Sequence, residues 1–176
     1  EMETGIWMVF SDPRRLGHLD IILAGGEAEH PLLSHLGIEP LSNHLSGPWL
    51  SDVLRGKKTP IKSALLDQRL IAGLGNIYVN EALHMSGISP RRMAQTIAGK
   101  RAEKLVIAIR TVLAAAIEAG GTSLRDHVQP GGEIGYFVQR LSVYGRTSEP
   151  CLTCATPIKE LRQSGRASFY CPSCQR

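Results

Sequence analysis

The sequence predicts a mainly α-helical protein that ends in a metal-binding β-hairpin and begins with the last part of a β domain. Three observations carry this prediction. Apolar residues recur with the period of an amphipathic helix between Lys100 and Ala119. All four cysteines follow residue 150, as two Cys-x-x-Cys pairs. Residues 5–10 form a short apolar and aromatic run of strand composition.

The β segment is expected to contain two strands, at Gly5–Phe10 and Leu19–Leu23, with Ser11-Asp12-Pro13 as the turn between them. Two strands alone are marginally stable in water. We therefore expect residues 1–28 to be the end of a larger N-terminal β domain, and the chain to be a fragment of a longer protein.

The loop between these strands reads Arg14-Arg15-Leu16-Gly17. Two arginines with an apolar tip could enter a DNA groove and wedge into the base stack. A solvated basic turn is the simpler interpretation of the same residues, and the residues alone favour it.

The helical region is expected after a loop at residues 30–46. Ser46 is placed to cap a helix that ends at Gly56, and a short helix should cover Ile61–Leu66, with Lys62 on its outer side. A further helix is expected from Asn76 to Ser86, before the long amphipathic one at residues 100–119. Gly120-Gly121 should end that last helix.

The stretch Gly73-Leu74-Gly75-Asn76 lies directly before the third of these helices. Glycines allow a tight connection, and the first N–H groups of a helix point outward without partners. Together with the helix dipole they favour a bound phosphate. An ordinary glycine-rich helix start explains the pattern equally well.

The cysteine pairs Cys151/Cys154 and Cys171/Cys174 have the spacing of a four-thiolate zinc ribbon. Paired disulfides or a redox site are the alternatives, but a redox motif would need a βαβ setting that is missing. Because four thiolates leave no open position, the zinc ion is expected to be structural. Gly165 indicates a turn between the pairs, with Arg166 near the hairpin tip.

The glycine-rich segment at residues 129–135 is either a mobile loop that covers a ligand or a plain surface loop.

The chain carries 20 Lys and Arg against 16 Asp and Glu, with a formal charge of +4 and a pI of about 9.0. This balance permits a nucleic-acid partner without proving one. No apolar run approaches the roughly 18 residues of a membrane span, and no signal peptide opens the chain.

These residues together resemble the formamidopyrimidine-DNA glycosylase family and its endonuclease VIII relatives. The matching segments follow one another along almost the whole chain. They are residues 12–15 (DPRR), 35–37 (HLG), 39–41 (EPL), 58–62 (KTPIK), 73–78 (GLGNIY), 120–122 (GGT), 135–137 (GYF), 143–146 (VYGR), 150–151 (PC) and 166–171 (RASFYC). The segment at 12–15 and the glycine-rich loop favour the glycosylase branch.

The resemblance implies a helix–two-turn–helix domain at residues 29–140, a four-cysteine zinc finger at 141–176, and a remnant of a β-sandwich domain before them. It also implies the DNA-binding portion of a base-excision-repair glycosylase and AP lyase. Such an enzyme removes oxidised purines, including 8-oxoguanine and formamidopyrimidines, and nicks the strand. Its partner is double-stranded DNA with an oxidised base or an abasic site. We expect a monomer in the bacterial cytoplasm, associated with the nucleoid.

The same mapping assigns roles to single residues. DNA binding falls to Arg14, Lys57, Lys62, Asn76 and Arg166, and Arg166 is also the proton donor of the second elimination. The loop that folds over the everted base includes Gln129, Gly131, Gly132, Gly135 and Tyr136. The zinc ligands are Cys151, Cys154, Cys171 and Cys174. Glu81 matches a glutamate near the catalytic amine, although a buried structural glutamate fits the position equally well.

Two features depart from the family pattern. Leu16 stands where the family usually has a phenylalanine wedge. The family's nucleophile, an N-terminal proline amine followed by a glutamate, has no match in Glu1-Met2-Glu3, so no residue here can be assigned the attack on the sugar. We therefore expect the 176 residues alone to be inactive. A non-catalytic DNA-binding module and an RNA- or ribosome-associated protein stay as alternatives.

Overall fold

The computed structural model describes residues 5, 7, 9–12, 15–122 and 136–176. The chain divides into two compact units, Glu1–His35 and Leu36–Arg176. The prediction placed the first boundary at residue 28 and a further one at residue 140, and these domain limits stay a prediction.

The first unit contains a single turn of 3-10 helix, Glu27–Glu29, and no strand among its described residues. The described residues of the two expected strands, at 5–10 and 19–23, therefore form no strand in this structure. The reason is a lack of apolar cover: Val9 is 80% exposed and Ile21 is 91% exposed. A strand pair gains stability by packing one face on other elements, and these side chains have none in their unit.

The loop that follows the expected first strand is closed by Asp12. Its carboxylate accepts hydrogen bonds from the N–H groups of Leu16, at 3.3 Å, and Gly17, at 2.7 Å. Leu16 is 79% exposed at this loop, which is compatible with either a solvated turn or a wedge. Arg14 lies outside the described residues.

The described residues of the second unit form four α-helices: α1 (Gly47–Val53), α2 (Ile61–Leu65), α3 (Asn76–Met85) and α4 (Lys100–Glu118). All four were expected from the sequence. Ser46 caps α1 as predicted, because its Oγ accepts a hydrogen bond from Trp49 N at 3.3 Å. Single turns of 3-10 helix lie at Ala94–Thr96 and Phe137–Arg140.

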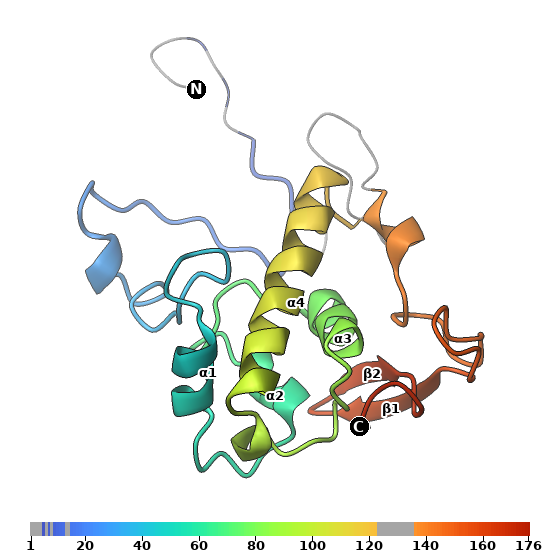
Figure 1. Cartoon of the computed structure of the whole chain (residues 1–176). Helices are drawn as coiled ribbons and strands as arrows, with labels where there is room; N and C mark the ends of the chain where they lie inside the picture. The colour runs from blue at the N-terminus through green and yellow to red at the C-terminus, as the bar shows by residue number, and fades with distance from the viewer. Residues whose placement is uncertain (1–4, 6, 8, 13–14, 123–135) are drawn as a thin grey trace. The chain divides into compact units, whose positions relative to one another are not determined.

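The long helix α4 is the centre of this unit. It packs against α1 on one side and α3 on the other (Figure 1). Its buried face includes Leu105, Ile109 and Val112, which meet Leu50 and Leu83 in one apolar core. The helical period predicted from the sequence is thus confirmed. The position of α3 is fixed by its packing against α4.

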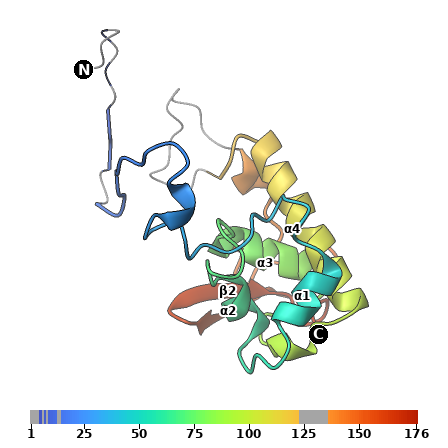
Figure 2. The same cartoon turned by 90° about the vertical axis from the view of Figure 1, so that its left-hand side faces the viewer.

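The hairpin consists of β1 (Lys159–Gln163) and β2 (Arg166–Tyr170), paired antiparallel with Gln163 opposite Arg166. Ser164 and Gly165 form the two-residue turn, both with positive φ, as hairpin turns of this length require. β2 packs against α3, with α2 close by (Figure 2). Arg166 is therefore the first residue after the tip, as predicted.

Lys62 corrects the prediction for α2. The sequence pattern placed this side chain outward, but it is fully buried. A helical pattern describes only which face of α2 is apolar, whereas the cover over Lys62 is β2, more than a hundred residues later in the chain.

Among the described helices, none is both long and apolar enough to cross a lipid bilayer.

Candidate nucleic-acid interface and zinc site

The N-terminus of α3 is open. Gly73 takes a positive φ of 75°, and its N–H is held by the Gln68 side-chain oxygen at 2.8 Å. Gly75 is the N-cap in an extended conformation, and no side chain among the described residues caps the helix. An uncapped helix start presents N–H groups and a partial positive charge, which suits an anion.

The main-chain oxygen of Ala167 in β2 joins this helix start to the hairpin. It accepts hydrogen bonds from Lys62 Nζ at 2.6 Å and from Asn76 Nδ2 at 3.2 Å. One donor comes from α2 and the other from the first residue of α3. The three segments therefore meet at a single carbonyl group, next to the tip residue Arg166.

Further polar contacts fix the hairpin in this position. Lys62 Nζ also donates to Ser168 Oγ at 2.7 Å, and that hydroxyl donates to Gln163 Oε1 at 2.8 Å. On the next turn of α3, Asn80 Oδ1 accepts from Phe169 N at 2.8 Å. Because several bonds hold β2 on α2 and α3, the location of Arg166 is set by the helices.

The electrostatics of this corner are positive. Arg166 is exposed, and no acidic partner of its guanidinium is found in the described parts of the chain. Burial lowers the pKa of Lys62 to about 8, and the nearby charge of Arg166 adds to the effect. A phosphate bound here would pair with the Arg166 guanidinium, and it would also favour the charged form of Lys62.

The other predicted DNA contacts are distributed differently. Lys57 is exposed on the loop after α1, where its main-chain oxygen accepts a hydrogen bond from Gln95 N at 3.1 Å. Tyr136 is 64% exposed, and its N–H donates to Ala119 O at 3.0 Å, beside the end of α4. The remaining predicted loop residues, Gln129, Gly131, Gly132 and Gly135, lie outside the described residues.

The four cysteines converge. Their sulfur atoms all lie within 4.8 Å of one another, and Cys154 Sγ is 3.4 Å from both Cys171 Sγ and Cys174 Sγ. A tetrahedral zinc ion with bonds of about 2.3 Å places its sulfurs roughly 3.8 Å apart. The donor set and its dimensions therefore fit one zinc ion with no open coordination position.

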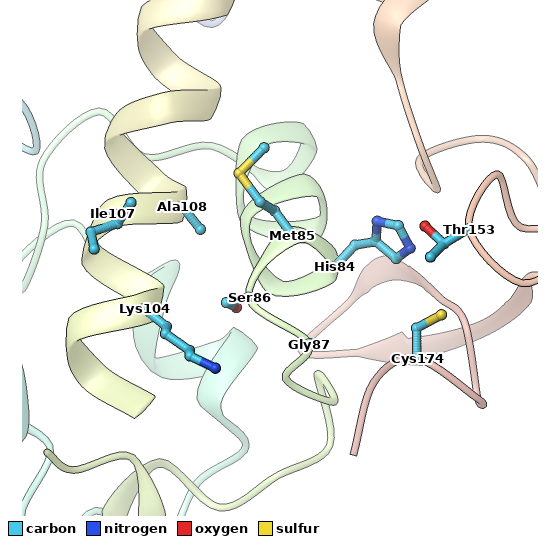
Figure 3. A pocket seen from close by; sticks show the side chains of 9 residues that line it. All are labelled: His84, Met85, Ser86, Gly87, Lys104, Ile107, Ala108, Thr153 and Cys174. Atoms are coloured by element: carbon cyan, nitrogen blue, oxygen red, sulfur yellow. The ribbon is translucent and has the colours of Figure 1, made fainter. Parts of the chain in front are cut away.

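His84 at the end of α3 lies next to this metal site. Its Nε2 is 3.6 Å from Cys151 Sγ, and burial lowers the pKa of the ring. The same region has a pocket of about 540 Å³, which Figure 3 shows between α4, the end of α3 and the cysteine loops. It is at the opposite end of α3 from Asn76, and of the predicted site residues that the structure describes, only Cys174 lines it.

Glu81 is buried in the middle of α3, and its carboxylate holds a loop. It accepts hydrogen bonds from the N–H groups of Ser142, Val143 and Tyr144 at 2.8–3.0 Å. Of the two interpretations of the sequence, the contacts seen here are those of a structural glutamate. The loop it holds leads from the helical region into the cysteine-rich hairpin.

Comparison with known proteins places these features in a family. Residues 36–128 match the family model described as "Formamidopyrimidine-DNA glycosylase H2TH domain". The chain belongs to the formamidopyrimidine-DNA glycosylase family. Residues 148–176 match the model "Zinc finger found in FPG and IleRS". Together with the sulfur geometry, this match assigns the four cysteines to one structural zinc ion.

The similarity to individual glycosylases is extensive. A formamidopyrimidine-DNA glycosylase of Beijerinckia indica is 52% identical over 99% of this chain and 64% of its own length. The crystal structure of MutM (Fpg) from Thermus thermophilus superposes with a TM-score of 0.86 and 44% identity, over 93% of this chain and 62% of that one. A MutM complex with DNA that contains carbocyclic 8-oxo-G gives a TM-score of 0.74 and 35% identity, over 82% and 52%. The chain thus spans less than two thirds of these relatives.

Sequence reasoning found the ends of this network and missed its middle. It selected Asn76 and Arg166 but not Asn80, Gln163 or Ser168, whose hydrogen bonds help to hold the hairpin in place. The one available signal was the spacing of Asn76 and Asn80, four residues apart on one face of α3. Gln163 and Ser168 carry no signal of their own, because their partners on the helical region, Pro90 and Lys62, are far away in the sequence.

Proposed function

We propose that this chain is the DNA-binding part of a base-excision-repair glycosylase and AP lyase. The whole protein would remove oxidised purines, 8-oxoguanine and formamidopyrimidines, from double-stranded DNA and nick the strand at the resulting abasic site. In this chain, the start of α3 and the tip of the hairpin would together hold the phosphates that flank the lesion.

The observation that carries the proposal is the shared carbonyl of Ala167. Lys62 and Asn76 both bind it, so the open start of α3 and Arg166 form one positive corner. Two anion-binding groups held this close suit adjacent phosphates of one backbone. The relative in complex with 8-oxo-G DNA supports the choice of nucleic acid and of lesion.

The roles that we propose for single residues are those that the family resemblance implies. Arg166 would bind the lesion phosphates and give the proton of the second elimination, Asn76 and its neighbouring amides would hold a flanking phosphate, and Lys57 would contact the backbone nearby. Lys62 would act through its charge, from beneath the hairpin. Arg14 would fill the space left by the everted base, and the loop with Gln129, Gly131, Gly132, Gly135 and Tyr136 would cover that base.

We infer that these 176 residues do not supply the nucleophile that catalysis needs. None of them matches the proline amine that the family resemblance assigns to attack on the sugar. We therefore infer that the chain alone binds lesion-containing DNA without nicking it. We further propose that it acts as a monomer associated with the bacterial nucleoid, in line with the bacterial source of its relatives.

Binding is tested with the zinc-loaded chain and a 25-base-pair duplex that contains a tetrahydrofuran abasic-site analogue. Arg166→Ala should weaken binding about tenfold by removing a phosphate contact, and Asn76→Ala should weaken it to a similar degree. Arg101→Ala on the first turn of α4 removes the same charge elsewhere and serves as control. Wild-type affinity in both site variants would remove this corner from the DNA interface.

Activity is tested separately, because a glycosylase and a non-catalytic binding module share the affinity just described. The whole protein should form a covalent complex with 8-oxoguanine duplex that borohydride traps, since an amine nucleophile gives a Schiff base. No trapping by the whole protein would favour the non-catalytic module. Nicking by the 176 residues alone would show that a nucleophile lies within them.

A further inference from the structure

A second positive surface lies at the other end of the hairpin, away from Arg166. It is a groove of about 670 Å³ between the loop that follows α3, the open end of the hairpin and the last residues of the chain. Its basic residues are Arg91, Arg92, Lys159 and Arg176. None of them was selected as a site residue from the sequence.

The walls of the groove are joined by hydrogen bonds. Gln175 is buried, donates from Nε2 to Ile88 O at 2.8 Å and accepts from Cys171 N at 2.8 Å. Ser89 N donates to Arg176 O, and Arg176 N donates to Gly87 O, at 3.2 and 3.1 Å. The loop after α3 and the zinc-bound segment are thus one structure, so the groove exists before any ligand binds.

The charge of the groove is uncompensated by side chains. Among the described residues, no Asp or Glu lines it, and none of its four cations forms an ion pair with an Asp or Glu side chain. The Nε of Arg92 donates to the main-chain oxygen of Arg176 at 3.0 Å, which fixes its orientation. Arg91 and Lys159 are exposed and free to contact a partner.

We propose that this groove binds the phosphodiester backbone of the same duplex, several base pairs from the lesion. Several cations along an open groove are what a sequence-independent backbone contact requires. The inference rests on the proposed function, because the hairpin tip defines where the lesion phosphates lie.

The hairpin sets the distance between the two sites. Tyr170 lines the groove and is four residues from Arg166 along β2, which corresponds to roughly 13 Å. On a duplex this distance is about four base pairs. The continuity along one hairpin favours DNA over an acidic peptide as the partner of the groove.

The test compares three double variants of the zinc-loaded chain. Arg91→Ala/Lys159→Ala removes two exposed charges from the groove without removing a side-chain hydrogen bond. Arg91→Lys/Lys159→Arg keeps the charges, and Lys100→Ala/Arg101→Ala removes two exposed charges from α4. Affinity for the tetrahydrofuran duplex is measured over a range of salt concentrations, together with phosphate-ethylation interference.

The groove variant should bind about tenfold more weakly, with a salt slope lower by about two, whereas the other two should match the wild type. Ethylation about four base pairs from the lesion should impair wild-type binding but not binding of the groove variant. An unchanged slope and interference pattern in the groove variant would overturn the inference while leaving the lesion site intact. Polyglutamate serves as a probe for an acidic peptide. If the groove variant lost binding to polyglutamate but bound DNA normally, the inference would be overturned in favour of an acidic peptide. A wild-type chain that binds no duplex would refute the proposed function itself.

Discussion

At the scale of single residues, Lys62 is a cation enclosed by the protein and stabilised by two oxygen acceptors. Its ammonium group donates to Ala167 O and Ser168 Oγ. A buried charge destabilises the folded state unless it is paired, and these acceptors are neutral. An anion bound nearby, as proposed above, would supply the missing charge.

The lowered pKa of Lys62 predicts a pH dependence of stability. The folded chain releases this proton near pH 8, whereas an unfolded lysine holds it up to about 10.5. Between these values the unfolded state binds more protons, so the free energy of unfolding should rise with pH. Relative to Lys62→Met, the wild type should gain about 2 kcal/mol between pH 7.5 and 9.5 in urea denaturation. A constant difference between the two proteins would contradict the lowered pKa.

Glu81 gives a second prediction at this scale. Glu81→Ala removes the acceptor of three buried or half-buried N–H groups, at Ser142, Val143 and Tyr144. Each orphaned donor costs about 1–3 kcal/mol, so the loss in thermal or urea denaturation should be about 3 kcal/mol or more. Glu118→Ala, an exposed glutamate of α4, is the control and should cost less than about 1 kcal/mol. Equal effects would show that the loop does not depend on Glu81.

At the scale of elements, the hairpin is a small structure with two supports. Zinc holds its open end, and hydrogen bonds to α2 and α3 hold the strand β2. Its own apolar cluster is limited to residues such as Val143, Ile158 and Phe169. So small a core contributes little to stability, and metal binding must supply much of it.

Removal of one zinc ligand is therefore expected to unfold the hairpin alone. Cys154→Ala should release zinc, and hydrogen exchange of β1 and β2 should become fast. Amides in the middle of α4 should stay protected, because their core is formed by the other helices. Retention of one zinc ion per chain in this variant would refute the four-thiolate site.

Elements were predictable from the sequence to the extent that their causes are local. The period of apolar residues located α4, Ser46 located the start of α1, and cysteine spacing located the metal site. The described residues before residue 25 do not form the expected strands, since a strand depends on neighbours that a local pattern does not contain. The prediction that Lys62 points outward was wrong for the same reason, because the strand that buries this side chain lies far away in the sequence.

At the scale of the whole molecule, the helices of the second unit fix the positions of both ends of the hairpin. The tip arginine lies at the start of α3, and the open end lies in the basic groove formed with the loop after α3. Zinc is bound at the open end of the hairpin, away from Arg166 at its tip. Its effect on DNA binding must therefore be indirect.

This arrangement predicts that chelation of zinc weakens DNA binding while the helices persist. Without zinc the hairpin loses one of its supports, and Arg166 is no longer fixed beside Asn76. Affinity for the tetrahydrofuran duplex should fall at least tenfold after chelator treatment and recover when zinc is added back, with helical circular dichroism largely retained. Full affinity of the zinc-free chain would separate the hairpin from the interface.

The carbonyl of Ala167 has a consequence for how this protein tolerates change. Both Lys62 and Asn76 bind an atom of the main chain, which every amino acid possesses. Replacement of the Ala167 side chain leaves that oxygen in place, so exchanges at this position should be tolerated as far as space permits. A single-residue insertion or deletion in β2 would instead present a different carbonyl and turn the strand over. The number of residues between the turn and the zinc ligand decides which carbonyl group Lys62 and Asn76 bind. The spacing between Gly165 and Cys171 should therefore be less tolerant of change than the side chain at residue 167.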